Sequence, residues 1–466
     1  MSPRLRRAGR VLLAVSVSAA AMAGICTAGV ATAMGQSYPA PPSAVPGPVR
    51  STAPDTGDDD RIDVAVVLGA SGSVAADALV PYEVFARSDR FSVSVVAADR
   101  TPATLSGGLY VLPDRTFDEV TTPPDVVVVP AVVDPTGQLE ARLRDWTAGQ
   151  AARGSRVLGI CDGARVLAAA GLLDGRRATA HWSSVERLAE DHPGVAWSRG
   201  VRYVEDGPVT TTAGITSGAV GALRLVERLA GAEEAERVGT AVGYPGWSAD
   251  GGPGMPVHRR ALTDLTRELD TAFPWLRPTI GVGLVEGVSE IDVAAAAEVW
   301  SGASSAARVL PVGAGPVVTT QHGLALLVRP ADAATPSVDR FVVPGVTDTG
   351  QVGPRLARWA ADRGLDVQLP TAEYGGGFGF DPLLLDLARH ADRATAAATA
   401  AYAEYPTGHL DLSGPAWPWR PTVLAVAALA VSLGLGLLPT AVRRTRSRRR
   451  TTRLSRPPSR RAETRT

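Results

Sequence analysis

A pattern of residues occurs twice in this chain, 215 positions apart, and it limits the folds that the chain can adopt. The repeated features are an apolar run, an aspartate and a glutamate: Val64–Leu68, Asp77 and Glu83 return as Ile280–Leu284, Asp292 and Glu298. The first run is a continuous β-branched stretch, as in a strand that is covered on both faces. The repeat therefore predicts two domains that share one fold.

Alternating strands and helices are expected in the first copy. Strands are expected at 64–68, 91–97, 125–130, 156–160 and 209–212, and helices at 75–86, 138–153, 164–170 and 217–229. This alternation predicts a mainly parallel α/β sheet. Both copies end in a helix followed by Tyr-Pro, at Tyr244 and Tyr405, with an offset of only 161. The second copy therefore lacks about 54 residues, which correspond to Gly159–Thr212.

Both ends of the chain carry a long apolar run without a charged residue. Val11–Met34 follows four arginines, and Pro421–Val442 precedes a tail with eleven. The second run has 22 residues, enough for a helix of about 33 Å that crosses a bilayer once. The first is typical of a secretory signal with cleavage at Ala31–Ala33, or of an uncleaved signal anchor.

The formal net charge of zero is the sum of three unlike parts. Residues 443–466 carry +10 and residues 1–35 carry +4, so residues 36–442 carry −14. The positive-inside rule places the tail in the cytoplasm and the acidic body outside. We therefore expect a cell-membrane protein with one or two spans, whose basic tail faces anionic lipid and not nucleic acid.

These observations give an expected organisation along the whole chain. It comprises a signal peptide or signal anchor at 1–35, a disordered linker at 36–60, a first domain at 61–247, a connecting segment at 248–276, a degenerate second domain at 277–409, a transmembrane helix at 421–442 and an Arg-rich cytoplasmic tail at 443–466. We also expect the two domains to pair within the chain.

The part that the second copy lacks contains a pattern with chemical meaning. Gly159-x-Cys161-x-Gly163 lies between an expected strand and an expected helix. This is the spacing of a nucleophile elbow, in which flanking glycines allow a sharp turn. The positive end of the helix would favour a thiolate and could receive an oxyanion.

The sequence around this elbow resembles a known superfamily. The segments that carry the resemblance are Gly159–Ala164, Ala169–Trp182, Asp77–Phe85 and Ala213–Gly218. They are similar to the ThiJ/PfpI superfamily, and most to the amidotransferase-like domain of AraC-type regulators and to isonitrile hydratase. The resemblance implies a three-layer, flavodoxin-like sandwich of the class I glutamine amidotransferase type. It covers residues 62–247 well and the second copy in part.

The resemblance also implies roles for three residues. Cys161 would be the elbow cysteine, Asp77 the acidic residue that faces it, and His181 the histidine near the pocket. An acid beside a thiol can act as a general acid or base, depending on its environment. A histidine beside a thiol could instead be the base.

Candidate binding residues are Gly108, Asp162 and Gly163. Two positions depart from the pattern of the superfamily: Asp162 stands where relatives often have Thr, and Val220 where they often have Asp. A negative side chain at position 162 would oppose a thiolate. The DNA-binding part that regulators carry is also missing from this chain.

Structural alternatives exist for each candidate. Cys161 could be a small buried residue, and His181 beside Trp182 a structural one. Asp77 recurs as Asp292 in a copy without the elbow cysteine, so it could instead cap a helix. The other histidines show no ligand spacing, so neither a metal nor a cofactor is expected.

Three functions remain open from the sequence. The first is a cysteine-dependent hydrolase, hydratase or amidase that acts on a small molecule. The second is a non-catalytic ligand or redox sensor at the cell surface, in which Cys161 could form a sulfenic acid. The third is a domain derived from a regulator that has lost its DNA-binding module.

Overall fold

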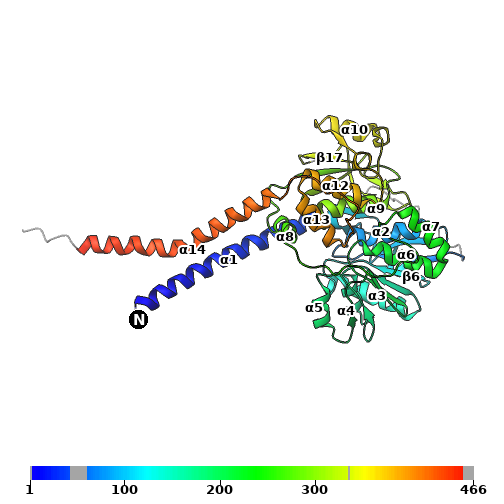
Figure 1. Ribbon diagram of the computed structural model, residues 1–466, viewed down its shortest axis with the longest axis horizontal. Coiled ribbons are helices and arrows are strands. Elements are labelled where there is room, and N and C mark those ends of the chain that lie inside the picture. The colour runs from blue at the N-terminus through cyan, green and yellow to red at the C-terminus, as the bar shows by residue number, and fades with distance from the viewer. Residues whose placement is uncertain (1–2, 42–59, 334–335, 455–466) are drawn as a thin grey trace, which may run out of the picture.

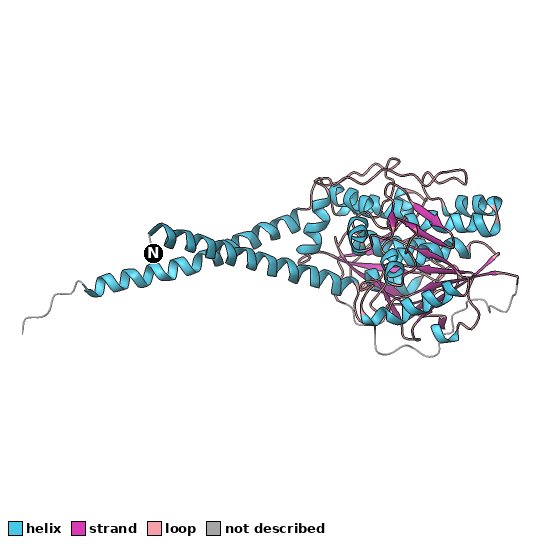
Figure 2. Cartoon of the chain, turned by 90° about the horizontal axis from the view of Figure 1, so that it is seen from below, coloured by secondary structure: helices cyan, strands magenta, loops and turns pink. Residues whose placement is uncertain are grey.

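The computed structural model describes residues 3–41, 60–333 and 336–454, which form an α/β body with two long helices projecting from it. Helix α1 spans Pro3–Ser37 and helix α14 spans Trp419–Leu454. Both helices leave the same side of the body and run side by side, as Figures 1 and 2 show.

The first half of the body contains a seven-stranded sheet in the order β10-β11-β7-β6-β1-β2-β5. Its strands are β1 (Ile62–Val67), β2 (Phe91–Ala97), β5 (Arg115–Thr116), β6 (Val126–Val129), β7 (Arg156–Gly159), β10 (Tyr203–Asp206) and β11 (Val209–Thr212). All neighbours pair in parallel except β10 with β11. The predicted α/β fold with a mainly parallel sheet is confirmed.

Helices cover both faces of this sheet. Those on one face are α2 (Ala75–Ala86), α6 (Ser217–Ala230) and α7 (Ala232–Val242), and those on the other are α3 (Ala141–Ala152), α4 (Gly163–Ala169) and α5 (Val185–Asp191). Alternate residues of β1 enter the two cores, with Val64 and Val66 facing α2 and with Ala65 and Val67 facing α3 and α4. Full burial on both faces explains the unbroken apolar run of this strand.

The second half contains a five-stranded parallel sheet in the order β16-β13-β12-β17-β18. Its strands are β12 (Thr279–Leu284), β13 (Arg308–Gly313), β16 (Arg329–Pro330), β17 (Arg340–Val342) and β18 (Val367–Gln368). In chain order this matches the arrangement β5-β2-β1-β6-β7 of the first sheet. Its helices are α9 (Glu290–Ala297), α10 (Pro354–Ala361), α11 (Pro370–Tyr374), α12 (Phe380–His390) and α13 (Arg393–Tyr402), with α8 (Asp264–Ala272) before the sheet.

Two features join the halves. The largest hydrophobic core contains side chains of α2 and α6 from the first half and of α9, α12 and α13 from the second. A four-stranded antiparallel sheet combines β3 (Ala103–Leu105) and β4 (Leu109–Val111) with β14 (Val317–Thr319) and β15 (Ala325–Leu327). A short pair, β8 (Arg177–Ala178) and β9 (Ala196–Trp197), lies apart from these sheets.

The contact between α2 and α9 includes two reciprocal hydrogen-bonded carboxylates. Glu83, near the end of α2, accepts a hydrogen bond of 2.7 Å from the backbone N–H of Ile291 at the start of α9. Glu298, just after α9, accepts one of 3.1 Å from the backbone N–H of Ala75 at the start of α2. Each glutamate therefore satisfies free N–H groups at the first turn of the opposite helix, where negative charge is favoured.

The segment after α1 differs from the solvated linker expected at 36–60. The helix continues to Ser37, and the guanidinium of Arg277 donates to the Gln36 side chain at 2.7 Å. Tyr110 donates to the carbonyl of Ala40 at 3.0 Å, so this segment lies against the body. Residues 42–59 of the expected linker lie outside the described residues.

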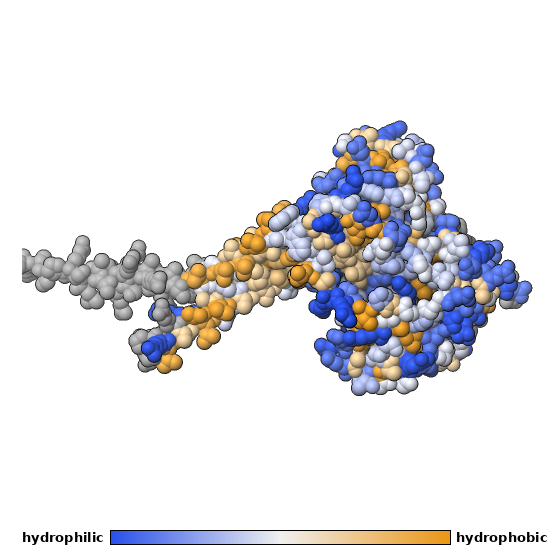
Figure 3. All heavy atoms as spheres, in the orientation of Figure 1, coloured by the Kyte–Doolittle hydropathy of each residue, from blue (hydrophilic) through white to orange (hydrophobic). Residues whose placement is uncertain are grey.

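Within the described part of the chain, two helices are long and apolar enough to cross a membrane, Ala8–Ser37 and Trp419–Leu437. Figure 3 shows their apolar side chains gathered along both helices, outside the body. The last turns of α1 also pack against the body, because Ala33 is only 3% exposed and the backbone of Gly29 approaches the carbonyl of Ala272. The expected cleavage site at Ala31–Ala33 therefore lies inside a docked helix.

We expect Glu298→Ala to lower the free energy of unfolding by about 1–3 kcal/mol, since the N–H of Ala76 loses this buried acceptor and the N–H of Ala75 keeps only the Ser106 hydroxyl. Chemical denaturation of the full chain in detergent, followed by circular dichroism, measures this. The exposed Glu233→Ala variant is the control and should stay within about 0.5 kcal/mol of the wild type. Equal losses in the two variants would contradict the capping role.

Candidate functional site

Cys161 lies at a sharp turn between β7 and α4. Its φ of 56° is in the left-handed region, which non-glycine residues rarely adopt. A Cβ at Gly159 would lie 2.6 Å from the Leu167 side chain, and one at Gly163 would overlap the carbonyl of Val129. Both flanking positions therefore need glycine, and the strained turn has the geometry expected of a nucleophile elbow.

Asp77, on α2, lies next to this thiol. Its Oδ2 accepts a hydrogen bond of 3.0 Å from the backbone N–H of Ala131. Its Oδ1 is buried and receives no hydrogen bond from an N–H or O–H group of the described residues. The Cys161 thiol interacts with this carboxyl and lowers its pKa. Asp77 does not cap α2, because Ser106 and Glu298 accept from the first N–H of that helix.

Burial favours the protonated form of both groups. It raises the pKa of the Cys161 thiol well above the usual value, and the negative charges of Asp77 and Asp162 raise it further. Burial likewise raises the pKa of Asp77, with smaller contributions from Glu298 and Asp162 in the same direction. The surroundings therefore favour the protonated forms of the thiol and of the carboxyl, and oppose the thiolate that the helix end alone would favour.

The ring of His181 forms hydrogen bonds with residues other than Cys161. Its Nε2 donates to the carbonyl of Tyr402 at 2.8 Å, and its Nδ1 lies 2.6 Å from the Ser183 hydroxyl. Burial lowers the pKa of His181 and keeps the ring neutral. Among the described residues, no hydrogen bond joins this ring to Cys161. The structure thus places His181 near the site, as a residue that orients Tyr402.

The second half of the chain contributes to the surroundings of the thiol. The Tyr402 ring lies between His181 and the guanidinium of Arg267, which is 3.6 Å from the ring centre. The pKa of Tyr402 is raised to about 12, mainly by burial, and Cys161 is among the smaller causes. Glu404 accepts a hydrogen bond from the backbone N–H of Gly214, and its charge raises the pKa of the thiol.

The segment that follows α1 contributes Tyr38. Its ring packs on the backbone of Gly72, where a Cβ would lie 2.8 Å from the ring. Burial raises the pKa of Tyr38, and Glu298, Tyr402 and Asp77 raise it further. Tyr38 therefore lies beside the same acids that surround Cys161, and three distant parts of the chain enclose the site.

The candidate binding residues occupy different positions. Asp162 begins α4 and accepts a hydrogen bond of 2.8 Å from the Ser184 hydroxyl, while its Oδ1 is buried without a partner among the described residues. Gly163 lies directly after it, in the first turn of α4. Gly108, with φ of 71°, lines a different cavity of about 590 Å³, next to Pro39 and the second half.

A small cavity lies on the His181 side of the site. It has a volume of about 120 Å³, and its lining includes Ala180, Trp182, Ala213, His258 and Glu404. Glu404, whose charge raises the pKa of the thiol, is part of this lining, whereas Cys161 is not. Its volume would hold only a small ligand.

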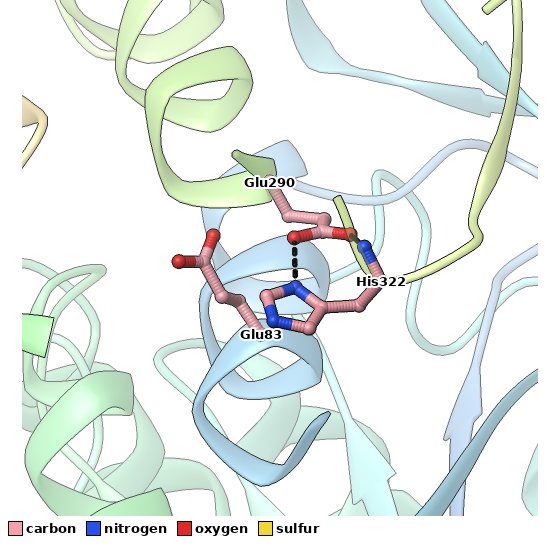
Figure 4. Close-up of side chains that lie close together, drawn as sticks. All are labelled: Glu83, Glu290 and His322. Atoms are coloured by element: carbon pink, nitrogen blue, oxygen red, sulfur yellow. Dashed lines mark hydrogen bonds and ion pairs between the residues drawn. The ribbon is translucent and has the colours of Figure 1, made fainter. Parts of the chain in front are cut away.

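A cluster of Glu83, Glu290 and His322 has the composition of a metal site (Figure 4). Its oxygen atoms are already hydrogen-bonded, however. Both oxygens of Glu83 accept from Arg87, Ser289 and Ile291. Glu290 accepts from His322 Nδ1 at 2.8 Å and from the Thr320 hydroxyl at 2.5 Å. A metal ion would have to displace these donors, so we interpret the cluster as a hydrogen-bonded network between the halves.

Comparisons with known proteins match this geometry. The sequence model of the DJ-1/PfpI family matches residues 63–228, which include Asp77, Cys161 and His181. Isonitrile hydratase from Pseudomonas putida is 39% identical over 160 residues, which cover 34% of this chain and 68% of that protein. The chain belongs to the DJ-1/PfpI family.

Two further proteins are also similar to part of this chain. The HTH-type transcriptional regulator CdhR from Pseudomonas aeruginosa is 32% identical over 151 residues, which cover 32% of this chain and 44% of that protein. A ThiJ/PfpI family protein from Pseudomonas syringae, of solved structure, is 26% identical with a TM-score of 0.37 and covers 46% of this chain and 89% of its own. The predicted likeness to this superfamily is confirmed.

Sequence reasoning missed Tyr38, Tyr402 and Glu404. No local motif marks them, since they reach the site only through the packing of α1 and of the second half. Glu298 carried a signal, because it repeats Glu83 at the 215-residue offset. This repetition predicted that the two halves share a fold, but it did not predict that Glu298 lies close to Asp77.

We expect Glu404→Gln to change how stability depends on pH. Burial raises the pKa of Glu404 to about 7 from 4.5. Between these values the carboxyl ionises in the unfolded chain but stays protonated in the folded one, so the wild type loses stability as pH rises through this window. Glutamine does not ionise, so the variant lacks this loss. Between pH 5 and 7 the free energy of unfolding of the variant should rise relative to that of the wild type by up to about 1.4 kcal/mol per pH unit.

Denaturant titrations of both proteins at several pH values measure the difference. The exposed Glu233→Gln variant is the control and should follow the wild type throughout. A constant difference between Glu404→Gln and the wild type would contradict the prediction.

Proposed function

We propose that this protein hydrates or hydrolyses a small molecule, with Cys161 as the nucleophile and Asp77 as the general acid. The observation that carries the proposal is the pair itself: a buried carboxyl with one unpartnered oxygen beside a thiol on a strained elbow. A carboxylic acid that remains protonated at neutral pH can deliver a proton to a substrate.

The substrate class that suits this pair has an electron-rich carbon–nitrogen multiple bond, and one relative is named for hydrating an isonitrile. Asp77 would protonate the terminal carbon, and the Cys161 sulfur would add to that carbon and return its proton to Asp77. Water would then add to the resulting thioimidate, and the C–S bond would break. The products are a formamide and the free thiol, so one water is consumed.

Other residues would position the reactants. The backbone N–H of Asp162, just before α4, interacts with the thiol and can hold a developing negative charge, whereas the N–H of Gly163 donates to the carbonyl of Ile160 at 2.7 Å. His181 would fix Tyr402 over the thiol through its hydrogen bond of 2.8 Å. The nearby cavity of about 120 Å³ favours a small substrate.

A non-catalytic ligand sensor is the second candidate. Two observations favour it: the pKa of the thiol is raised, and Tyr38 and Tyr402 lie beside the acids of the site. The same burial disfavours a redox sensor, because oxidation to a sulfenic acid proceeds through the thiolate. Turnover separates an enzyme from a sensor.

The purified full chain in detergent should convert n-propyl isocyanide to N-propylformamide, measured by chromatography. Asp77→Asn should lose at least about a hundredfold in rate because it cannot supply the proton, and Cys161→Ser should be equally impaired. The exposed Asp118→Asn variant is the control. Intact-mass analysis of the wild type during turnover should detect an adduct of the substrate on Cys161. Full activity in Cys161→Ser would refute the mechanism.

We further propose that α1 and α14 form a two-helix membrane anchor. Both helices are apolar and pack together, and Gly436 of α14 approaches the backbone of Ala14 of α1 closely. The basic residues at the chain ends follow the outer ends of both helices, which supports a cytoplasmic location for both ends and an extracytoplasmic body. The docking of Ala33 and Gln36 supports an uncleaved helix α1.

The shared order of five strands supports an origin of the two halves by duplication. In this proposal residues 61–247 and 277–409 pair within the chain as two copies of the fold. The first copy keeps the elbow, and the second has lost the segment that contains it.

An N-terminal epitope tag tests the anchor. We expect the tag to remain on the mature protein in membrane fractions, because α1 stays docked. Protease added to cells with a permeable outer layer should degrade the body and spare both tagged ends. Loss of the N-terminal tag from the mature protein would show cleavage and refute the two-helix anchor.

A further inference from the structure

A cavity lined by residues of both halves, among them Glu83 and Arg87 of the first, is not used by the proposed chemistry. Its volume is about 490 Å³, within the range of small-molecule sites, and Asp292 lines it. Asp292 is the repeat counterpart of Asp77. In the first half, Cys161 follows strand β7 and faces Asp77. The matching strand of the second half, β18, is instead followed by Leu369 and Pro370.

The cavity lies where the second half lacks the elbow segment. Its wall includes Gly377 and Gly379, in the glycine run between α11 and α12. A Cβ at Gly379 would lie 2.6 Å from Asp292 Oδ1, and one at Gly345 would lie 2.5 Å from Oδ2. The backbone at these two glycines therefore closely approaches the carboxylate, and a larger residue would block it.

The carboxylate of Asp292 has no committed hydrogen-bond donor among the described residues. Ser289 is the hydroxyl within reach, and it donates its single proton to Glu83 Oε2 at 2.7 Å. Burial raises the pKa of Asp292 to about 7, and the charge of Glu83 adds to this rise. Asp292 is therefore a half-buried acid that lines the cavity, and no other donor among the described residues bonds to its oxygens.

The charges around the cavity favour a cation. Arg87 is its one basic lining residue, and both contacting nitrogens of this guanidinium donate to Glu83, at 2.6 and 2.9 Å. The charge of Arg87 also acts on Asp292, but this guanidinium makes no hydrogen bond to Asp292 or Glu286 among the described residues, and three carboxyl groups share one arginine in the lining. A metal ion is less suited than an organic cation, because the oxygens of Glu83 are already occupied by donors.

We propose that the second half binds a small organic ammonium ion, with Asp292 as the anchoring carboxylate. An ammonium group carries three N–H donors and would supply the hydrogen bonds that Asp292 lacks. The backbone at Gly345 and Gly379 would hold the carboxylate against the ligand. This site does not depend on Cys161, so its test is independent of the test of the proposed hydration chemistry.

The test uses the full chain in nonionic detergent at pH 8, where a carboxyl with a pKa of about 7 is mostly ionised. The probes are propylammonium and its neutral analogue 1-propanol, measured by saturation-transfer NMR against a detergent blank. Variants are Asp292→Asn, which keeps the shape and removes the charge, and Gly379→Ala, which fills the approach to Oδ1. Cys161→Ser is the control for the first half.

We expect saturable binding of propylammonium and no matching signal from 1-propanol. Asp292→Asn should weaken binding by about tenfold or more, since a charged hydrogen bond is lost, and Gly379→Ala should weaken it too. Cys161→Ser should bind as the wild type does. Equal signals from both probes, or unchanged binding in Asp292→Asn, would overturn the proposal, and so would the lack of any propylammonium signal.

Discussion

The rest of the structure depends on reciprocal hydrogen bonds between α2 and α9. Glu83 of α2 bonds to the start of α9, and Glu298, just after α9, bonds to the start of α2. Glu83 and Glu298 are fully buried and each bonds to N–H groups at the start of the opposite helix. Buried charges are tolerated only where such partners exist, and Arg87 of the same helix bonds to only one oxygen of Glu83. The other oxygen of Glu83 accepts from Ser289 and Ile291 of the second half. The two halves must therefore meet in one orientation, which also aligns the strands of the shared antiparallel sheet.

This orientation determines the chemistry of the candidate site. It brings Glu298 close to Asp77 and places Tyr402 and Glu404 near Cys161. The added burial and negative charge raise the pKa of both the thiol and its acid. An elbow that would favour a thiolate in isolation thus becomes a site that favours the protonated forms of both groups.

Much of the fold could be predicted from the sequence because its signals are local. The unbroken apolar strand at 64–68, the elbow at Cys161 and the helix at 75–86 depend on near neighbours and lie as expected. The surroundings of the thiol could not be predicted, since Tyr38 and Tyr402 are separated by more than 360 residues and meet only through packing. His181 was identified as a neighbour of the site, but its hydrogen bond to Tyr402 lies beyond the reach of any motif.

The residues that surround Cys161 come from distant parts of the chain, and this affects how the protein folds during synthesis. Tyr38 lies near the start of the chain and Glu404 near its end, so most of the polypeptide must be synthesised before the thiol is covered. Contacts between such distant residues form late in folding. During synthesis Cys161 is open to solvent and to oxidants, and a chaperone or reductant that protects nascent thiols would matter more for this protein than for its single-domain relatives.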